Sequence, residues 1–321
     1  MDDYDARSVF SDFLPGVAGV YGKPVWAFFV NRGQCMASFG LRSKNFPIME
    51  FNAANKAYQN TPSLGFRTFL QGTRGKKKTF LAEPFSPQTT CYDGGENNNN
   101  NNFHQSRRKP KRRMFVGPSE IQIQEIDWEN EIETNVTYFV LPDESYPALV
   151  RRTVVTNLAR REDLSLSLLD GLARIEPRGG EINRMLKDEG FSTQASMGVY
   201  RPYKNSLAYP FYRLLRGPEY FASEPGEQRA GHFCLAIMEG DNPHLLPIVY
   251  DTSRVFGQDT SLLNPLRLHE KTVAEILDEP QYGFGVTSSA FAAGRFFHRL
   301  TISCVCVKMA SSHSFFCRQH S

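Results

Sequence analysis

The sequence lacks any long hydrophobic run. No stretch approaches the roughly 18 consecutive apolar residues that a membrane-spanning helix needs. The first ten residues are acidic and contain no apolar segment of the kind found in secretory signal peptides. We therefore expect a protein without a membrane partner, in the cytoplasm.

Cysteine is scarce as well, with six residues in a chain of 321. A chain of this length can bury a large core without covalent cross-links, so we expect reduced thiols, as in the cytosol. Cys304 and Cys306 are separated by one residue, and no second pair of cysteines or histidines stands at metal-ligand spacing. We expect neither a metal site nor a cofactor.

Net charge is also small. The chain has 37 Lys and Arg residues against 34 Asp and Glu, which leaves a formal charge of +3 and no overall field that would attract nucleic acid. The exception is the basic run from Arg107 to Arg113, which follows a tract of asparagines. We interpret about residues 90–113 as a disordered insertion between strands. A nucleic-acid-binding or nuclear localisation segment is the alternative, although no aromatic residues are interleaved with the charges.

What the sequence does contain is a series of short apolar runs typical of β-strands. The runs 25–30 and 35–39 flank the polar loop Asn31 to Gln34, and together they predict a β-hairpin. Leucine and serine alternate from Leu164 to Leu168, which predicts a half-buried strand over 164–169. The other predicted strands are 121–126, 134–141, 149–157, 233–238 and 296–307.

Helical patterns are few. Residues 272–279 form the clearest, ended by Pro280, and residues 52–59 could form two turns. Asp170 and Gly171 are a dipeptide typical of a hairpin turn, which we predict there. The fold class that follows is mostly β, an antiparallel sandwich or barrel with few short helices.

Five sequence blocks together resemble the amino-terminal portion of cellobiose-phosphorylase-like glycoside phosphorylases, once grouped as glycosyltransferase family 36. The blocks are residues 25–34, 39–44, 46–52, 65–69 and 168–172. This resemblance implies a large antiparallel β-supersandwich of the galactose-mutarotase type over residues 20–307. Residues 1–19 would then be a lead-in and residues 308–321 an irregular tail.

In that family a helical linker and an (α/α)6 barrel follow the sandwich. An aspartic acid of the barrel protonates the glycosidic oxygen while inorganic phosphate, the co-substrate, attacks the anomeric carbon with inversion. This sequence ends where the sandwich would meet the linker, so the resemblance implies that the catalytic domain is absent, and we nominate no catalytic residue. It implies a carbohydrate-associated domain whose partners are carbohydrate and the missing catalytic domain. A stand-alone carbohydrate-binding module is the alternative.

Three residues in these blocks are candidates for contact with a sugar. Arg32 and Gln34 lie in the predicted hairpin loop, where a guanidinium and an amide could bind sugar hydroxyls or satisfy the carbonyls of the turn. Arg67 could project into the same cleft, or it could pair with a carboxylate such as Glu50. Core packing and a stacking face for a sugar ring are the alternatives for the two tryptophans, Trp26 and Trp128.

Overall fold

A computed structural model describes the fold. The described residues are 1–14, 25–41, 43–44, 47, 49, 51–74, 78–86, 109–141, 148–159, 164–175, 196–200, 206–208, 210–215, 231–240, 242–282, 284–285, 288–297 and 300–309. They form a mostly β protein with a ten-stranded, a five-stranded and a three-stranded sheet. Neighbouring strands are antiparallel in all three sheets. The predicted fold class is therefore confirmed.

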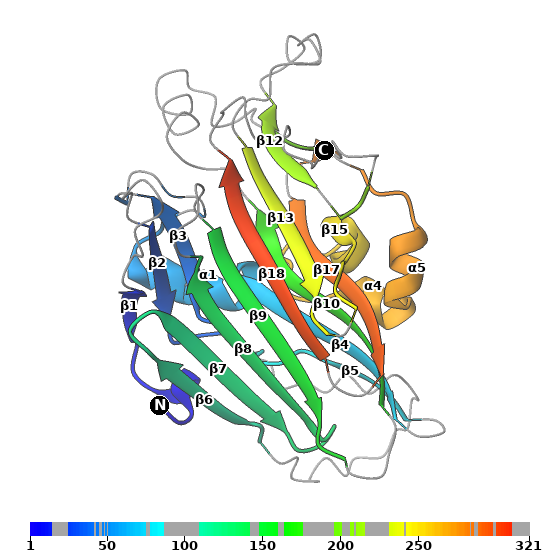
Figure 1. Ribbon diagram of the computed structural model, residues 1–321, viewed down its shortest axis with the longest axis horizontal. Coiled ribbons are helices and arrows are strands. Elements are labelled where there is room, and N and C mark those ends of the chain that lie inside the picture. The colour runs from blue at the N-terminus through cyan, green and yellow to red at the C-terminus, as the bar shows by residue number, and fades with distance from the viewer. Residues whose placement is uncertain are drawn as a thin grey trace.

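The ten-stranded sheet, here the large sheet, crosses the front of Figure 1. Its strands are, in spatial order, β6 (Lys111–Val116), β7 (Glu120–Asp127), β8 (Ile132–Val140), β9 (Ala148–Asn157), β18 (Leu300–Met309), β13 (Gly231–Met238), β12 (Phe211–Leu215), β11 (Ser196–Tyr200) and β16 (Phe284–Gly285), with β14 (His244–Leu245) beside β13. Buried and half-buried residues alternate along β8. Because side chains of a strand point alternately to opposite faces, this sheet has one core face and one outer face.

The five-stranded sheet lies behind the large sheet, and both of its faces are buried (Figure 1). Its strands are β15 (Ile248–Asp251), β17 (Ser288–Phe297), β10 (Leu164–Ile175), β4 (Phe66–Arg74) and β5 (Lys78–Ala82). Phe66 and Leu168 pack into the core shared with the large sheet, whereas Phe69 and Leu169 pack into a second core. That second core includes residues of the short helices α3 (Ser253–Phe256), α4 (Leu266–Glu270) and α5 (Val273–Asp278). The molecule is thus built in three layers, sheet on sheet on helices.

The three-stranded sheet contains the predicted hairpin. It consists of β1 (Ser11–Leu14), β2 (Val25–Val30) and β3 (Met36–Leu41), and the turn η1 (Tyr4–Ala6) precedes it. Trp26 and Phe28 pack against Ala57 of α1 (Ala54–Leu64), so Trp26 is a core residue with 9% of its surface exposed. Trp128, in the turn after β7, is 44% exposed.

The predicted turn at Asp170 and Gly171 is wrong. Both residues lie inside β10, which pairs with β4 and β17 on either side of them. A Cβ added at Gly171 would meet the Ala290 carbonyl oxygen of β17 at 1.9 Å. The glycine therefore allows the close approach of a neighbouring strand, which is a common reason for glycine inside a strand.

Several predicted boundaries also need correction. The predicted strand 296–307 is two strands, since β17 ends at Phe297 and β18 begins at Leu300. The proposed insertion ended at 113, yet β6 begins at Lys111, so its last residues belong to the large sheet. The proposed tail began at 308, yet β18 continues to Met309. Residues 90–108 and 310–321 lie outside the described part of the chain.

The helix predicted at 272–279 is confirmed as α5. Glu279, the residue that follows it, binds three basic side chains. Its carboxylate accepts hydrogen bonds from Arg254, Arg267 and Lys271, which come from α3, from α4 and from the residue that follows α4. The hydrogen bond from Lys271 is the largest influence on the pKa of Glu279, which falls to about 2 from an ordinary 4.5. The ionised carboxylate therefore ties the helical layer together.

We expect Glu279→Gln to lower the thermal unfolding midpoint near neutral pH and to have little effect in acid. A carboxyl pKa that is lower in the folded chain stabilises the fold above the unfolded value of 4.5, and this stabilisation is lost as the pH falls toward about 2. Midpoints of both proteins measured from about pH 6 to about pH 3 should converge at the acid end. Glu270→Gln is the control, because Glu270 is 65% exposed and pairs with Arg267 at 3.6 Å. Equal differences at both ends of this pH range would contradict the prediction.

Candidate functional site

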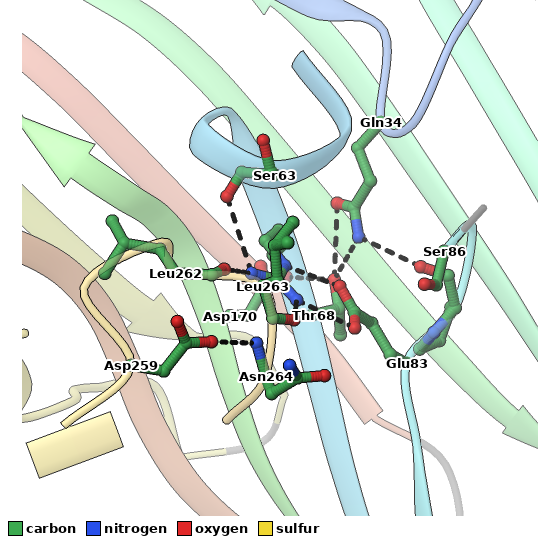
Figure 2. A network of polar contacts seen from close by, with 12 residues as sticks. Gln34, Ser63, Thr68, Glu83, Ser86, Asp170, Asp259, Leu262, Leu263 and Asn264 are labelled. Carbon is green, nitrogen blue, oxygen red and sulfur yellow. Dashed lines mark hydrogen bonds and ion pairs between the residues drawn. The ribbon is translucent and has the colours of Figure 1, made fainter. Parts of the chain in front are cut away.

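Arg67 on β4 lies at the seam between the five-stranded sheet and the helical layer, where Figure 2 shows its partners Glu83, Leu262 and Leu263. Its Nε and Nη2 bind the two carboxylate oxygens of Glu83 at 2.5 and 2.9 Å. Its Nη1 donates to the carbonyl oxygen of Leu262, and Nη2 donates to that of Leu263 at 2.9 Å. Arg67 is 3% exposed. Through these hydrogen bonds it holds the loop at Leu262 and Leu263 onto the five-stranded sheet. The carboxylate partner is Glu83; Glu50 lies outside the described residues.

Gln34 reaches from the hairpin loop toward the core between the two larger sheets, close to Thr68 and Asp170 (Figure 2). Its Nε2 donates to Thr68 Oγ1 at 3.0 Å, and its Oε1 accepts from Arg151 Nη2 at 2.5 Å. Only 2% of Gln34 is exposed. In this position the amide links the hairpin to β4 and β9.

Arg151 of β9 and Asp170 of β10, here the core ion pair, are the centre of that polar cluster. Arg151 Nη2 and Nε donate to the two Asp170 oxygens at 2.5 and 3.1 Å, and both side chains are 0% exposed. The Asp170 carboxylate also accepts from the hydroxyls of Thr68 and Thr153, at 2.6 and 2.8 Å. Arg151 Nη1 donates to the hydroxyl of Tyr138, whose pKa burial raises, so this tyrosine is neutral. Such a satisfied cluster fixes the two sheets relative to each other.

Arg32 occupies the other side of the hairpin loop and is half-buried. Its guanidinium carbon lies 4.4 Å from the centre of the Tyr58 ring. Nη1 and Nη2 donate to the carbonyl oxygens of Asn31 and Arg7, at 2.8 and 2.9 Å. All three predicted site residues therefore bind other groups of the chain. Their contact with sugar stays a prediction.

The end of the basic run is part of the fold. Arg112 is 5% exposed and donates to Glu125, Asp5 and the Ser86 carbonyl at 2.7, 2.6 and 2.7 Å. Burial raises the pKa of Glu125, while the charge of Arg112 and the Phe85 N–H oppose that rise. Within this part of the run, Arg112 is therefore used inside the core, whereas Lys111 is exposed and Arg113 is half-buried.

The outer face of the large sheet carries polar side chains that sequence reasoning did not single out. Here we call them the amide ladder: Arg113, Gln122, Gln124, Glu133, Asn135 and Thr137. Their positions are half-buried and alternate with buried ones on β6, β7 and β8. The register sets Gln122 opposite Thr137 and Gln124 opposite Asn135. The alternation of glutamine and isoleucine from Ile121 to Gln124 is the sequence signal that marks this face.

Hydrogen bonds connect the side chains of the ladder. Glu133 Oε1 accepts from Gln124 Nε2 at 2.8 Å and from Asn135 Nδ2 at 2.6 Å. Gln122 Nε2 donates to Asn135 Oδ1 at 3.4 Å. Phe115, opposite Gln122 on the edge strand, is 47% exposed. The face therefore presents oriented amides beside an exposed aromatic ring.

No protein-family model matches this chain, and no curated protein matches it. Among solved structures it is similar to a polysaccharide lyase, with a TM-score of 0.41 and 8% identity over 96% of this chain and 33% of the lyase. It is also similar to a bacterial glucoamylase complexed with acarbose, with a TM-score of 0.37 and 9% identity over 92% of this chain and 35% of the glucoamylase. This chain thus spans about a third of each. Likenesses this distant do not say what the chain binds.

No group of three His, Cys, Asp or Glu side chains in the described ranges could hold a metal ion. In the same part of the chain, no helix is long and apolar enough to cross a membrane. Side-chain amides both donate and accept hydrogen bonds, as hydroxyl groups do. The amide ladder is therefore suited to a ligand rich in hydroxyls.

Proposed function

We propose that this chain is a carbohydrate-binding β-supersandwich domain of a glycoside-phosphorylase-like protein, and that it does not turn over sugar by itself. The observation that carries the proposal is the amide ladder beside Phe115 on the outer face of the large sheet. Amides supply paired donors and acceptors for vicinal hydroxyls, and an exposed aromatic ring packs on the C–H face of a pyranose.

The phosphorylase-like part of the proposal is supported by the five resembling blocks and by a fold class of the kind they imply. Two of these blocks contain Arg67 and Asp170, which hold the layers of the molecule together. The blocks therefore support a shared fold more directly than a shared function, because one fold can host several functions. In the intact protein that we propose, a separate helical domain would supply the general acid for phosphorolysis.

Two assays on the purified chain test this function. Calorimetric titration with neutral oligosaccharides should show saturable binding. Incubation with cellobiose and inorganic phosphate should give no sugar 1-phosphate. Absence of binding across gluco-, manno- and xylo-oligosaccharides would overturn the binding role. Formation of sugar 1-phosphate would overturn the statement that the chain does not turn over sugar.

A further inference from the structure

We propose that the ligand of the amide ladder is a neutral, unbranched saccharide chain that lies across strands β6 to β9, with one ring packed on Phe115. This inference rests on the proposed function and adds the chemical class and the path of the ligand. It follows from the register of the four strands, from the hydrogen bonds within the ladder and from the pairing of its charges.

The register places functional side chains in rows that run across the strands. One row is Phe115, Gln122, Thr137 and Arg152, each directly opposite the next on β6, β7, β8 and β9. Neighbouring strands are about 4.8 Å apart, a spacing close to the repeat of pyranose rings in an extended chain. A saccharide laid along this row would meet one side chain from each strand, whereas a chain laid along a strand would meet side chains about 7 Å apart.

A second row holds the amides in place. Arg113, Gln124 and Asn135 are opposite one another on β6, β7 and β8. Glu133 accepts hydrogen bonds from both Gln124 and Asn135, and Gln122 of the first row donates to Asn135. Side chains already held in this way lose less rotational freedom when a ligand binds. The two rows together form a preorganised surface for hydroxyl groups.

The charges on this face favour a neutral ligand. Arg152 is bound to Glu239 at 2.8 Å, and Arg113 lies 3.2 Å from Asp2. Glu133 places a carboxylate in the middle of the ladder. A polyanion such as an oligo-uronate would gain little from cations that are already paired and would be repelled by Glu133. We therefore expect binding that changes little with salt concentration.

The aromatic end of the row can be tested with a matched pair of variants. Phe115→Ala and Val116→Ala each remove an exposed apolar side chain from β6, and these two residues are 47% and 51% exposed. Phe115 belongs to the outer row by alternation, whereas Val116 is the last residue of the strand. We expect Phe115→Ala to weaken binding of a neutral gluco-oligosaccharide about tenfold and Val116→Ala to change it less than about twofold.

The amides and the path are tested in the same titrations. The double variant Gln122→Ala, Gln124→Ala should weaken binding at least about tenfold while circular dichroism and the melting midpoint confirm folding. Affinity should rise with oligosaccharide length until the chain spans the row from β6 to β9, and then level off. An oligogalacturonate serves as the anionic probe and should bind more weakly than the neutral chain.

The outcomes separate this inference from the proposed function. If the wild-type chain binds saccharide but both the Phe115 and the double amide variants bind equally well, the domain binds sugar elsewhere and the ladder is not its site. If the wild-type chain binds no saccharide, both statements fail. Tighter, salt-dependent binding of oligogalacturonate would overturn the neutral class. Sedimentation that shows a dimer dissociated by the Phe115 variant would assign the face to a second copy of the chain instead.

Discussion

Arg151→Met should lower the free energy of unfolding by about 3–5 kcal/mol, because it leaves the Asp170 carboxylate buried without its cation. Both side chains are 0% exposed, and the two threonine hydroxyls that remain as donors carry no positive charge. Urea unfolding followed by fluorescence measures the change. We expect a lower midpoint with little change in slope, because the native fold is kept.

The adjacent residue gives a matched control. Arg152 is next in the same strand, yet its side chain is 49% exposed and pairs with Glu239 on the surface. Arg152→Met should therefore change the stability by less than about 1 kcal/mol. The double variant Arg151→Met, Asp170→Leu should recover part of the loss, since a buried ion pair replaced by apolar groups is often nearly neutral. Equal effects of the Arg151 and Arg152 variants would refute a structural role for the core ion pair.

Gly171→Ala should destabilise the protein by about 3 kcal/mol, because the new methyl group would lie 1.9 Å from the Ala290 carbonyl oxygen. β10 and β17 would have to separate at the centre of the five-stranded sheet, where pairing runs from Ser165 to Leu172. Thermal unfolding measures the loss, and hydrogen exchange of the amides in β10 and β17 locates it.

Gly240→Ala separates the steric effect from backbone strain. Gly240 has φ of 146°, close to the 156° of Gly171, but a Cβ there would have nothing within 4 Å. We expect this control to cost about 1 kcal/mol, the usual penalty for a non-glycine residue in such a conformation. A loss as large as that of Gly171→Ala would show that φ, and not the approach of β17, is the reason for glycine at 171.

The sequence alone does not decide whether the predicted site residues bind a ligand or bind other groups of the chain. Gln34 and Arg67 are polar side chains in two of the resembling blocks, and both are held by specific hydrogen bonds. Their partners Arg151 and Glu83 are 117 and 16 residues away. Nothing local to either residue identifies such a partner, so the choice between a ligand and an internal contact required the fold.

The sequence by itself determined the elements whose signals are local. Alternation of leucine and serine defined the first half of β10, the polar loop at Asn31 defined the hairpin, and the run from Thr272 to Pro280 defined α5, which begins with a capping box. These signals persist because each depends on neighbours in the chain. The class of fold followed from their number and order.

Only the tertiary structure decided what depends on strand pairing. It placed Asp170 and Gly171 inside a strand against a local turn preference, because an ion pair to β9 and the close approach of β17 outweigh that preference. It also brought Phe115, Gln122, Thr137 and Arg152 into one row. Register between strands is fixed by the shared core, so a surface assembled across four strands is specified by residues that lie beneath it.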